Sequence, residues 1–193
     1  MSDAFVEPWL APRSPIEDVS LPSGPDFAMR EAAPSDRFIF RGDEAARAAC
    51  SAAFGAELPA RLGAAGEGKN CAALWLGPDE WLLIIEGGDA EMFPVRIGLA
   101  VESHPHSLVD VSSRQLGLIV SGAKAGRVLG AGCPLDLDLR ACPVGLATRT
   151  IFDKAEIVLW RRGETAFQVE VWRSFAPYLA AALIEAARGA PDF

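Results

Sequence analysis

Apolar and polar residues alternate along several short stretches of this chain, with the period of two that is typical of strands. The most informative stretch is 115–121, where Leu116, Leu118 and Val120 alternate with other residues before Gly122 marks the end of the strand. A helix is predicted directly afterwards, over residues 123–130. A related pattern occurs earlier, because FIFRGDEAAR at 38–47 matches LIVSGAKAGR at 118–127 in the order of apolar, polar, glycine, alanine and arginine positions. The pattern indicates a duplicated unit.

The same reading assigns the remaining elements of both units. Helices are predicted at 43–54, 90–99, 123–130 and 175–188, and strands at 37–41, 71–76, 81–86, 107–112, 115–121, 147–152, 156–161 and 166–172. Residues 56–69 and 133–145 are expected to be loops. LWLGPDEWLL at 74–83 aligns with TIFDKAEIVL at 150–159, which extends the duplication through the hairpins. We therefore predict an α+β fold of two ferredoxin-like (split βαβ) halves with antiparallel sheets, residues 36–113 and 114–193.

Residues 1–35 differ from the rest, since they hold six prolines and few periodic apolar positions. Proline removes a backbone donor and fixes φ, so this segment is predicted to be an extended arm. Phe5, Val6, Trp9 and Leu10 cannot build a core within the arm. They are expected to dock either on the body of this chain or on a partner. The N-terminus has no basic start followed by a long apolar run, so a cytoplasmic location is expected.

Composition narrows the classes of function. The formal charge of −8 argues against nucleic-acid binding, which relies on clustered Lys and Arg. No apolar run reaches the ~18 residues needed to span a bilayer, so no membrane partner is expected. The four cysteines have no C-x-x-C spacing and only two histidines to accompany them, so they are interpreted as reduced, mostly buried thiols.

No motif predicts a catalytic, cofactor-binding or metal site. The chain has no G-x-x-x-x-G-K-[ST] phosphate loop, no G-x-G-x-x-G after a strand and no G-x-S-x-G elbow. His104 and His106 flank a proline and are interpreted as loop residues. Asp110 and Arg114 are candidates for an internal ion pair.

Four segments resemble one family in order and spacing. LGPDEWLLI at 76–84, DVSSRQLGLIVSGAKAGRVLGAGCPLDL at 110–137, CPVGLATRTIFDKAEIVLWR at 142–161 and VEVWRSFAPYLAAAL at 169–183 are similar to the gamma subunits of heterotetrameric sarcosine oxidases. The DVSSR-strand-SG-helix segment is more distantly similar to the aminomethyltransferase folate-binding fold, whose repeated ferredoxin-like units agree with the duplication.

The resemblance implies a subunit of a flavoenzyme that oxidatively demethylates sarcosine to glycine and passes the carbon to tetrahydrofolate. It implies alpha, beta and delta partner subunits, with FAD, FMN, NAD and tetrahydrofolate held by those partners and no cofactor in this chain. The expected role is non-catalytic, namely packing against the folate-binding region of the alpha subunit.

Candidate interface residues are Trp172, Arg173 and Phe175 at the end of a strand, together with Phe5, Trp9 and Leu10 in the arm. The other interpretation of the first three is that Trp172 and Phe175 belong to the core and that Arg173 caps a local carboxylate.

Two alternative functions stay open at the level of sequence. The first is a stand-alone folate-binding or folate-dependent one-carbon transfer protein, for which Glu86, Glu170 and Trp160 supply suitable side chains at positions too far apart to place together. The second is a structural homo-oligomer.

Overall fold

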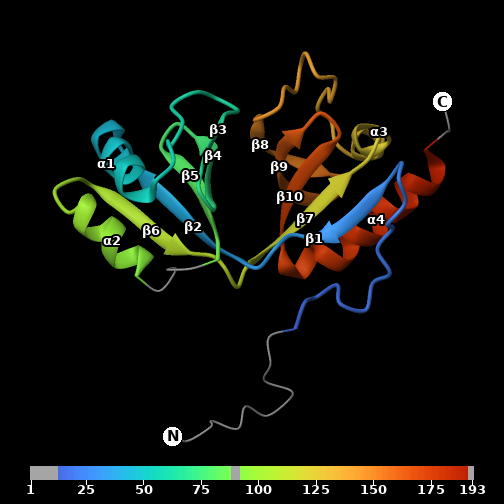
Figure 1. The fold of residues 1–193 in the computed structure, drawn as a ribbon, viewed down its shortest axis with the longest axis horizontal. Helices are drawn as coiled ribbons and strands as arrows, with labels where there is room; N and C mark the ends of the chain where they lie inside the picture. Colours follow the sequence, from blue (N-terminus) through green and yellow to red (C-terminus); the bar gives the residue numbers. More distant parts are fainter. Residues whose placement is uncertain (1–12, 88–91, 191–193) are drawn as a thin grey trace, which may run out of the picture.

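Two antiparallel sheets face each other in the computed structural model, and the helices cover their outer faces (Figure 1). The structure describes residues 13–87 and 92–190. Each sheet has five strands, which confirms the predicted α+β class of two ferredoxin-like halves. Within these residues no helix has the length and apolar character needed to cross a membrane.

The first half contains the elements between Ser35 and Asp110. In chain order they are β2 (Ser35–Gly42), α1 (Glu44–Phe54), β3 (Ala65–Gly68), β4 (Cys71–Gly77), β5 (Glu80–Glu86), α2 (Phe93–Ala100) and β6 (His106–Asp110). The strand order is β3-β4-β5-β2-β6. This order is the ferredoxin-like arrangement β4-β5-β2-β6 with β3 added at one edge.

The second half repeats this plan with one change. Its elements are β7 (Gln115–Ser121), α3 (Ala125–Gly130), β8 (Ala147–Phe152), β9 (Ala155–Gly163), β10 (Ala166–Trp172), the 3-10 helix η2 (Arg173–Phe175) and α4 (Ala176–Gly189). The strand order is β1-β7-β10-β9-β8, where β1 (Ala28–Glu31) comes from the N-terminal segment. β1, which precedes the first half in the sequence, therefore takes the place of the fourth ferredoxin-like strand in the second half.

The strand pairing corrects the predicted alignment of the two hairpins. β2 pairs with β5, and its counterpart β7 pairs with β10. The β4–β5 hairpin thus corresponds to β9–β10, and the alignment of 74–83 with 150–159 was wrong by one hairpin. Both hairpins of the second half are apolar with short turns, so the sequence does not reveal which one follows the pattern of the first half. β3 was assigned to a loop because its sequence, AGEG, has no apolar alternation.

The N-terminal segment also differs from the separate arm that the prolines suggested. β1 pairs with β7, and Ile16 is 3% exposed within the core of the second half. The backbone amide of Lys124 donates to the Asp26 carbonyl oxygen at 2.9 Å. Gly122 permits this approach, since it has a φ of +110° and a Cβ there would lie 2.3 Å from the same oxygen. From Arg13 onward the segment is therefore part of the second half; prolines exclude a helix but allow an edge strand.

Three apolar clusters stabilise the fold. One lies between α1, α2 and their sheet, and another between α3, α4 and the second sheet. The third joins the two sheets through residues such as Leu82 and Ile84 from the first half and Val158 and Trp160 from the second. Each sheet is thus buried on both faces, which explains why the central strands read as nearly continuous apolar runs.

Helix α1 starts and ends at residues that satisfy its free backbone groups. The Asp43 carboxylate accepts a hydrogen bond from the Ala46 amide at 2.8 Å, as an N-cap does. Gly55 has a left-handed φ of 87°, and its amide donates to the Ser51 carbonyl oxygen.

Candidate interaction surfaces

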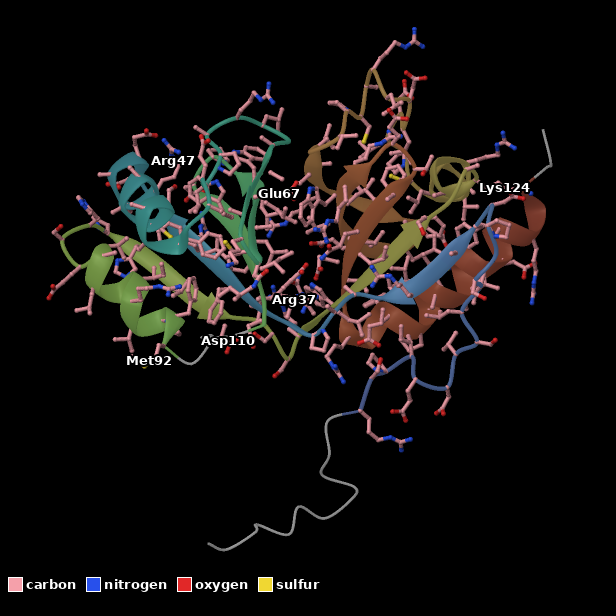
Figure 2. All side chains as sticks on the ribbon, in the orientation of Figure 1. Arg37, Arg47, Glu67, Met92, Asp110 and Lys124 are labelled. Atoms are coloured by element: carbon pink, nitrogen blue, oxygen red, sulfur yellow. The ribbon has the colours of Figure 1, made fainter. Side chains whose placement is uncertain are left out.

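A buried ion pair connects the two halves. Arg37 on β2 donates to Glu170 on β10, with Nε to Oε2 at 2.5 Å and Nη2 to Oε1 at 3.2 Å. The two side chains are 6% and 0% exposed. Figure 2 labels Arg37 at the junction between the sheets. A charge buried this deeply is tolerated only when it is paired and hydrogen-bonded.

Neighbouring side chains complete this pair and leave no free oxygen for a ligand. Gln168 Nε2 donates to Glu170 Oε1 at 2.7 Å, and Arg37 Nη1 donates to the Ser35 carbonyl oxygen at 2.7 Å. Gly117, which faces Glu170 across the β7–β10 pairing, makes room for them. A Cβ at Gly117 would lie 2.6 Å from Glu170 Oε1 and 2.9 Å from Arg37 Nη2. Glu170 is therefore a structural carboxylate.

The hollows between the sheets are small. One of about 220 Å³ is lined by Glu86, Trp160 and Arg162 among others, and another of about 80 Å³ by Glu170, Gln115 and Trp172 among others. Pockets for drug-sized ligands measure ~300–1,000 Å³. The structure thus brings Glu86 and Trp160 to one hollow but not Glu170, and Trp160 is itself 1% exposed. Among the described residues no cluster of His, Cys, Asp and Glu could hold a metal ion.

Asp110 and Arg114, the candidate ion pair, have different partners. Asp110 Oδ1 accepts a hydrogen bond from the Ser112 amide at 2.8 Å. The Arg114 guanidinium lies 5.5 Å from the ring centroid of Trp172. The geometry is that of a turn for Asp110 and of a cation–π contact for Arg114.

Trp172, Phe175 and Tyr178 are exposed aromatic residues at the junction of β10, η2 and α4, and we call them the aromatic ridge. Their exposed fractions are 43%, 41% and 37%. The three residues are spaced three apart in the sequence: Trp172 ends β10, Phe175 ends η2 and Tyr178 lies in the first turn of α4. The Tyr178 hydroxyl donates to the Asp153 carboxylate, which raises the pKa of Tyr178. The interpretation of Trp172 and Phe175 as core residues was wrong, although their assignment to a partner interface stays a prediction.

Arg173 joins this ridge to the N-terminal segment. Its Nη2 donates to the Arg13 carbonyl oxygen at 2.6 Å, so it does not cap a carboxylate as the alternative proposed. Phe5, Trp9 and Leu10 lie outside the described residues.

A second apolar surface lies on the outer side of the first half and was missed from the sequence. Val95 and Leu99 on α2 are 52% and 70% exposed, and Met92 precedes them on the same side. The neighbouring helix α1 exposes alanines at 45, 48 and 52. We call this the outer helical face. The signal was present, because Met92, Val95 and Leu99 follow helical spacing while Phe93 and Ile97 occupy the buried side.

The corresponding helix of the second half shows a different character. α4 occupies the place in its half that α2 occupies in the first, and its exposed side carries the ion pair Glu185–Arg188. An apolar surface on one of two equivalent helices is not required by the fold. The need to fold therefore does not by itself explain the exposed apolar residues of the outer helical face.

A third apolar surface is a groove of about 350 Å³ where loops of the two halves contact each other. The ribbon of these loops lies at the top of Figure 1. Leu62, Leu135 and Leu146 line the groove. Arg161 fixes the loop that the second half contributes to this groove. Its guanidinium donates to the carbonyl oxygens of Leu137 and Cys142 in that loop, each at 2.8 Å. Arg161 is 4% exposed, and these hydrogen bonds hold the loop in place.

Comparison with known proteins gives consistent matches. The model of the sarcosine oxidase, gamma subunit family matches residues 41–188. Sarcosine oxidase subunit gamma of Corynebacterium sp. (strain P-1) is 37% identical over 140 residues, which cover 72% of this chain and 68% of that protein. The corresponding subunit of Corynebacterium sp. (strain U-96) is 36% identical and covers 72% and 67%.

Two solved structures share the fold. A chain of the heterotetrameric sarcosine oxidase from Corynebacterium sp. U-96, in complex with pyrrole 2-carboxylate, superposes with a TM-score of 0.85 and 29% identity, covering 94% of this chain and 98% of that chain. The glycine cleavage system aminomethyltransferase T from Bartonella henselae superposes with a TM-score of 0.63 and 13% identity, over 84% of this chain and 46% of that chain. At this identity the second likeness concerns the fold alone.

Proposed function

The chain belongs to the sarcosine oxidase gamma subunit family, and from this premise we propose that it is a non-catalytic subunit of a heterotetrameric sarcosine oxidase. The observation that carries the proposal is the likeness to a chain of such an oxidase over 94% of this chain and 98% of the other, at a TM-score of 0.85. A likeness over the whole length supports the same role in an assembly, with alpha, beta and delta subunits as partners in the cytoplasm.

The chemistry of the buried groups supports a non-catalytic role. Glu170 is buried, pairs with Arg37 and has both carboxylate oxygens hydrogen-bonded within the chain, so neither oxygen is available to a substrate. Burial raises the pKa of Cys50 to about 12, which keeps that thiol protonated. Oxidative demethylation of an amine requires a cofactor that accepts electrons. We assign FAD, FMN, NAD and tetrahydrofolate to the partner subunits.

The role that we propose for this chain is to pack against the folate-binding region of the alpha subunit. The aromatic ridge is the surface that we assign to this contact, together with Arg173 and the N-terminal residues Phe5, Trp9 and Leu10. Trp, Tyr and Arg are the side chains that dominate the energy of protein interfaces. Trp172 and Phe175 are 43% and 41% exposed at the ends of β10 and η2, and exposed large aromatic residues support a contact with another chain.

Retention of the alpha subunit by the tagged full-length chain, after co-expression, tests this contact. The variant Trp172→Ser/Phe175→Ser is expected to lose most of the retained alpha subunit. Val95→Ser/Leu99→Ser on the outer helical face is the matched control, since it also removes two exposed apolar side chains. The control is expected to retain alpha. If the control loses alpha and the ridge variant retains it, the interface lies on the outer helical face. If neither the unaltered chain nor the control retains alpha, the subunit role is contradicted.

The alternative function, stand-alone folate binding, gains no support from the geometry of the described residues. Glu170 and Trp160 are both 1% exposed, and the larger hollow between the sheets is about 220 Å³. Titration of the isolated full-length chain with tetrahydrofolate separates the two functions, because a saturable site in this chain alone would favour the alternative.

A further inference from the structure

A polar hollow of about 80 Å³ lies between the two sheets, next to Trp172. Three of the polar side chains that line it make no hydrogen bond or ion pair with any other residue that the structure describes. They are a guanidinium, an amide and a carboxylate, which belong to Arg114, Gln115 and Glu156. Groups of three different kinds, all without partners, therefore border one small space.

The other charged residues of the lining are already paired. Arg149 Nη2 donates to Glu80 Oε1 at 2.5 Å, and Glu170 accepts from Arg37 as described above. These two pairs leave one positive charge in the lining, on the guanidinium, and one negative charge, on the unpaired carboxylate. A ligand that complements the hollow carries both a negative and a positive group.

Gln115 marks the buried end of this space. It is 7% exposed, and its Oε1 is buried without a hydrogen-bond partner in the described chain. Buried polar groups in native proteins are hydrogen-bonded in the great majority of cases, because an unpaired group costs free energy. The amide of Gln115 is thus a group to which a bound polar molecule would supply the missing hydrogen bond.

Arg114 is held in position beside the hollow. Its backbone amide donates to the Val111 carbonyl oxygen at 2.9 Å, and its carbonyl oxygen accepts from the Arg173 amide at 2.8 Å. The guanidinium lies over the Trp172 ring, 5.5 Å from its centroid. A guanidinium that packs against a ring by its face keeps the N–H groups at its edge free, and these can bind a carboxylate through two hydrogen bonds.

Glu156 lies on the opposite side of Trp172. Gln115 is opposite Trp172 in the β7–β10 pairing. In the β10–β9 pairing, Val171 is opposite Ile157. The next position along places Glu156 beside Trp172, on the same face of the sheet. Gln115 and Glu156 are then two strand spacings apart, ~10 Å, which exceeds a direct hydrogen bond but suits a small molecule that bonds at each end.

We propose that this hollow binds a small α-amino acid. Arg114 and the Gln115 amide donate to its carboxylate, Glu156 accepts from its ammonium group, and Trp172 forms the wall between them. One water needs ~10–15 Å³ of such a volume, so the hollow of about 80 Å³ has room for roughly five to eight water-sized groups. Amino acids with short side chains have that size. The site needs no second chain, so the proposal goes beyond the subunit role and can fail while that role holds.

Isothermal titration calorimetry of the full-length chain with glycine tests the proposal. Glycine joins the carboxylate of acetate to the ammonium group of methylammonium, so these two ions probe each end of the hollow alone. We expect saturable binding of glycine at one site. Its dissociation constant is expected to be about tenfold or more below those of acetate and methylammonium, because two linked groups bind in one event.

Three variants each remove one group of the site. Arg114→Gln, Glu156→Gln and Gln115→Met are each expected to weaken glycine binding by about tenfold or more. Gln115→Met keeps an unbranched side chain and removes the unpaired amide, so its thermal unfolding midpoint is expected not to fall. Arg61→Gln and Glu102→Gln are the matched controls, since both residues are exposed and form no ion pair in the described chain. Both controls are expected to keep the affinity of the unaltered chain.

The absence of saturable glycine binding by the unaltered chain would overturn the proposal. Acetate that binds as tightly as glycine would also overturn it, because Arg114 would then bind anions without a contribution from Glu156. Equal weakening in the site variants and the controls would contradict a defined site. If glycine does not bind and Arg114→Gln loses the alpha subunit in the retention experiment, charged side chains of the partner occupy the hollow, and the subunit role stands without this site.

Discussion

Arg37 and Glu170, which are 133 positions apart in the sequence, form a two-point ion pair between the two halves of the molecule. Each residue comes from an interior strand of its sheet, β2 and β10. The pair is enclosed by apolar side chains of the inter-sheet cluster, such as Ile84 and Val158. The orientation of one half relative to the other therefore depends on a polar contact within an apolar interface.

Replacing one member of this pair is expected to destabilise the protein strongly. Arg37→Met leaves the Glu170 carboxylate buried without its counter-charge, and removing one partner of a buried ion pair costs ~3–5 kcal/mol. The free energy of unfolding, measured by urea denaturation, is expected to fall by that amount. Arg37→Met combined with Glu170→Met should recover most of the loss, because an apolar pair needs no counter-charge.

A matched control distinguishes this effect from the general loss of an arginine. Arg41 and Asp79 also form an ion pair, but both side chains are more than half exposed. Arg41→Met is expected to leave the unfolding midpoint nearly unchanged, since exposed ion pairs contribute little. Equal losses for Arg37→Met and Arg41→Met would contradict the structural role of the buried pair.

Gly117→Ala is expected to destabilise the protein although alanine suits a strand better than glycine does. The added methyl group would lie 2.6 Å from Glu170 Oε1 and 2.9 Å from the Cβ of Ala32. Overpacking of this kind costs ~1–3 kcal/mol. Gly126→Ala on α3 is the control, because a Cβ there meets nothing within 4 Å. Helix propensity predicts that the control gains ~0.5–1 kcal/mol, and thermal unfolding of both variants measures the contrast.

The cap of α1 gives a test that is independent of the inter-sheet contact. Asp43→Ala removes the acceptor for the Ala46 amide, and the loss of an N-cap costs ~1 kcal/mol. Asp43→Asn keeps an acceptor oxygen at the same position and is expected to preserve stability in the same urea titration. A loss of equal size in both variants would mean that the charge of Asp43, rather than the hydrogen bond, stabilises the helix.

Cys50 predicts the behaviour of the protein at alkaline pH. Burial raises the pKa of Cys50 from 9.0 to about 12, so between these values the unfolded chain loses the thiol proton while the folded chain keeps it. Stability contributed by this difference is fully present below pH 9 and falls as pH rises toward 12. Iodoacetamide at pH 9 should therefore modify Cys50 only in denaturant, and Cys50→Ala should flatten the decline in stability above pH 9. Rapid modification of Cys50 in the native chain would contradict its burial.

The sequence predicted most of the local structure because local patterns determine it. β7 was predicted at residues 115–121, as observed, and α1 differed by one residue at its start. β1 and β3 were missed because each is four residues long and neither alternates between apolar and polar positions. Short edge strands of this kind form when a neighbouring strand has free backbone groups to pair with. The sequence of the edge strand itself gives no sign of that neighbour.

The contacts between the halves could not be predicted, because they depend on how two folded units meet. Arg37 and Glu170 are ordinary charged residues in strand patterns, and nothing local links them. Gly117 gave a partial signal, since a glycine inside a strand indicates a close approach by another group. The exposed positions of Trp172 and Phe175 were left open by the sequence, because aromatic residues at the end of a strand occur in cores and at interfaces alike.

The central claim, that this chain is a subunit of a heterotetrameric sarcosine oxidase, is tested most directly by native mass spectrometry. The full-length chain would be co-expressed with alpha, beta and delta subunits and purified through a tag on alpha. The expected result is one complex whose mass equals the sum of the four chains, together with its bound cofactors. A complex that forms from alpha, beta and delta alone, with this chain recovered separately, would contradict the claim.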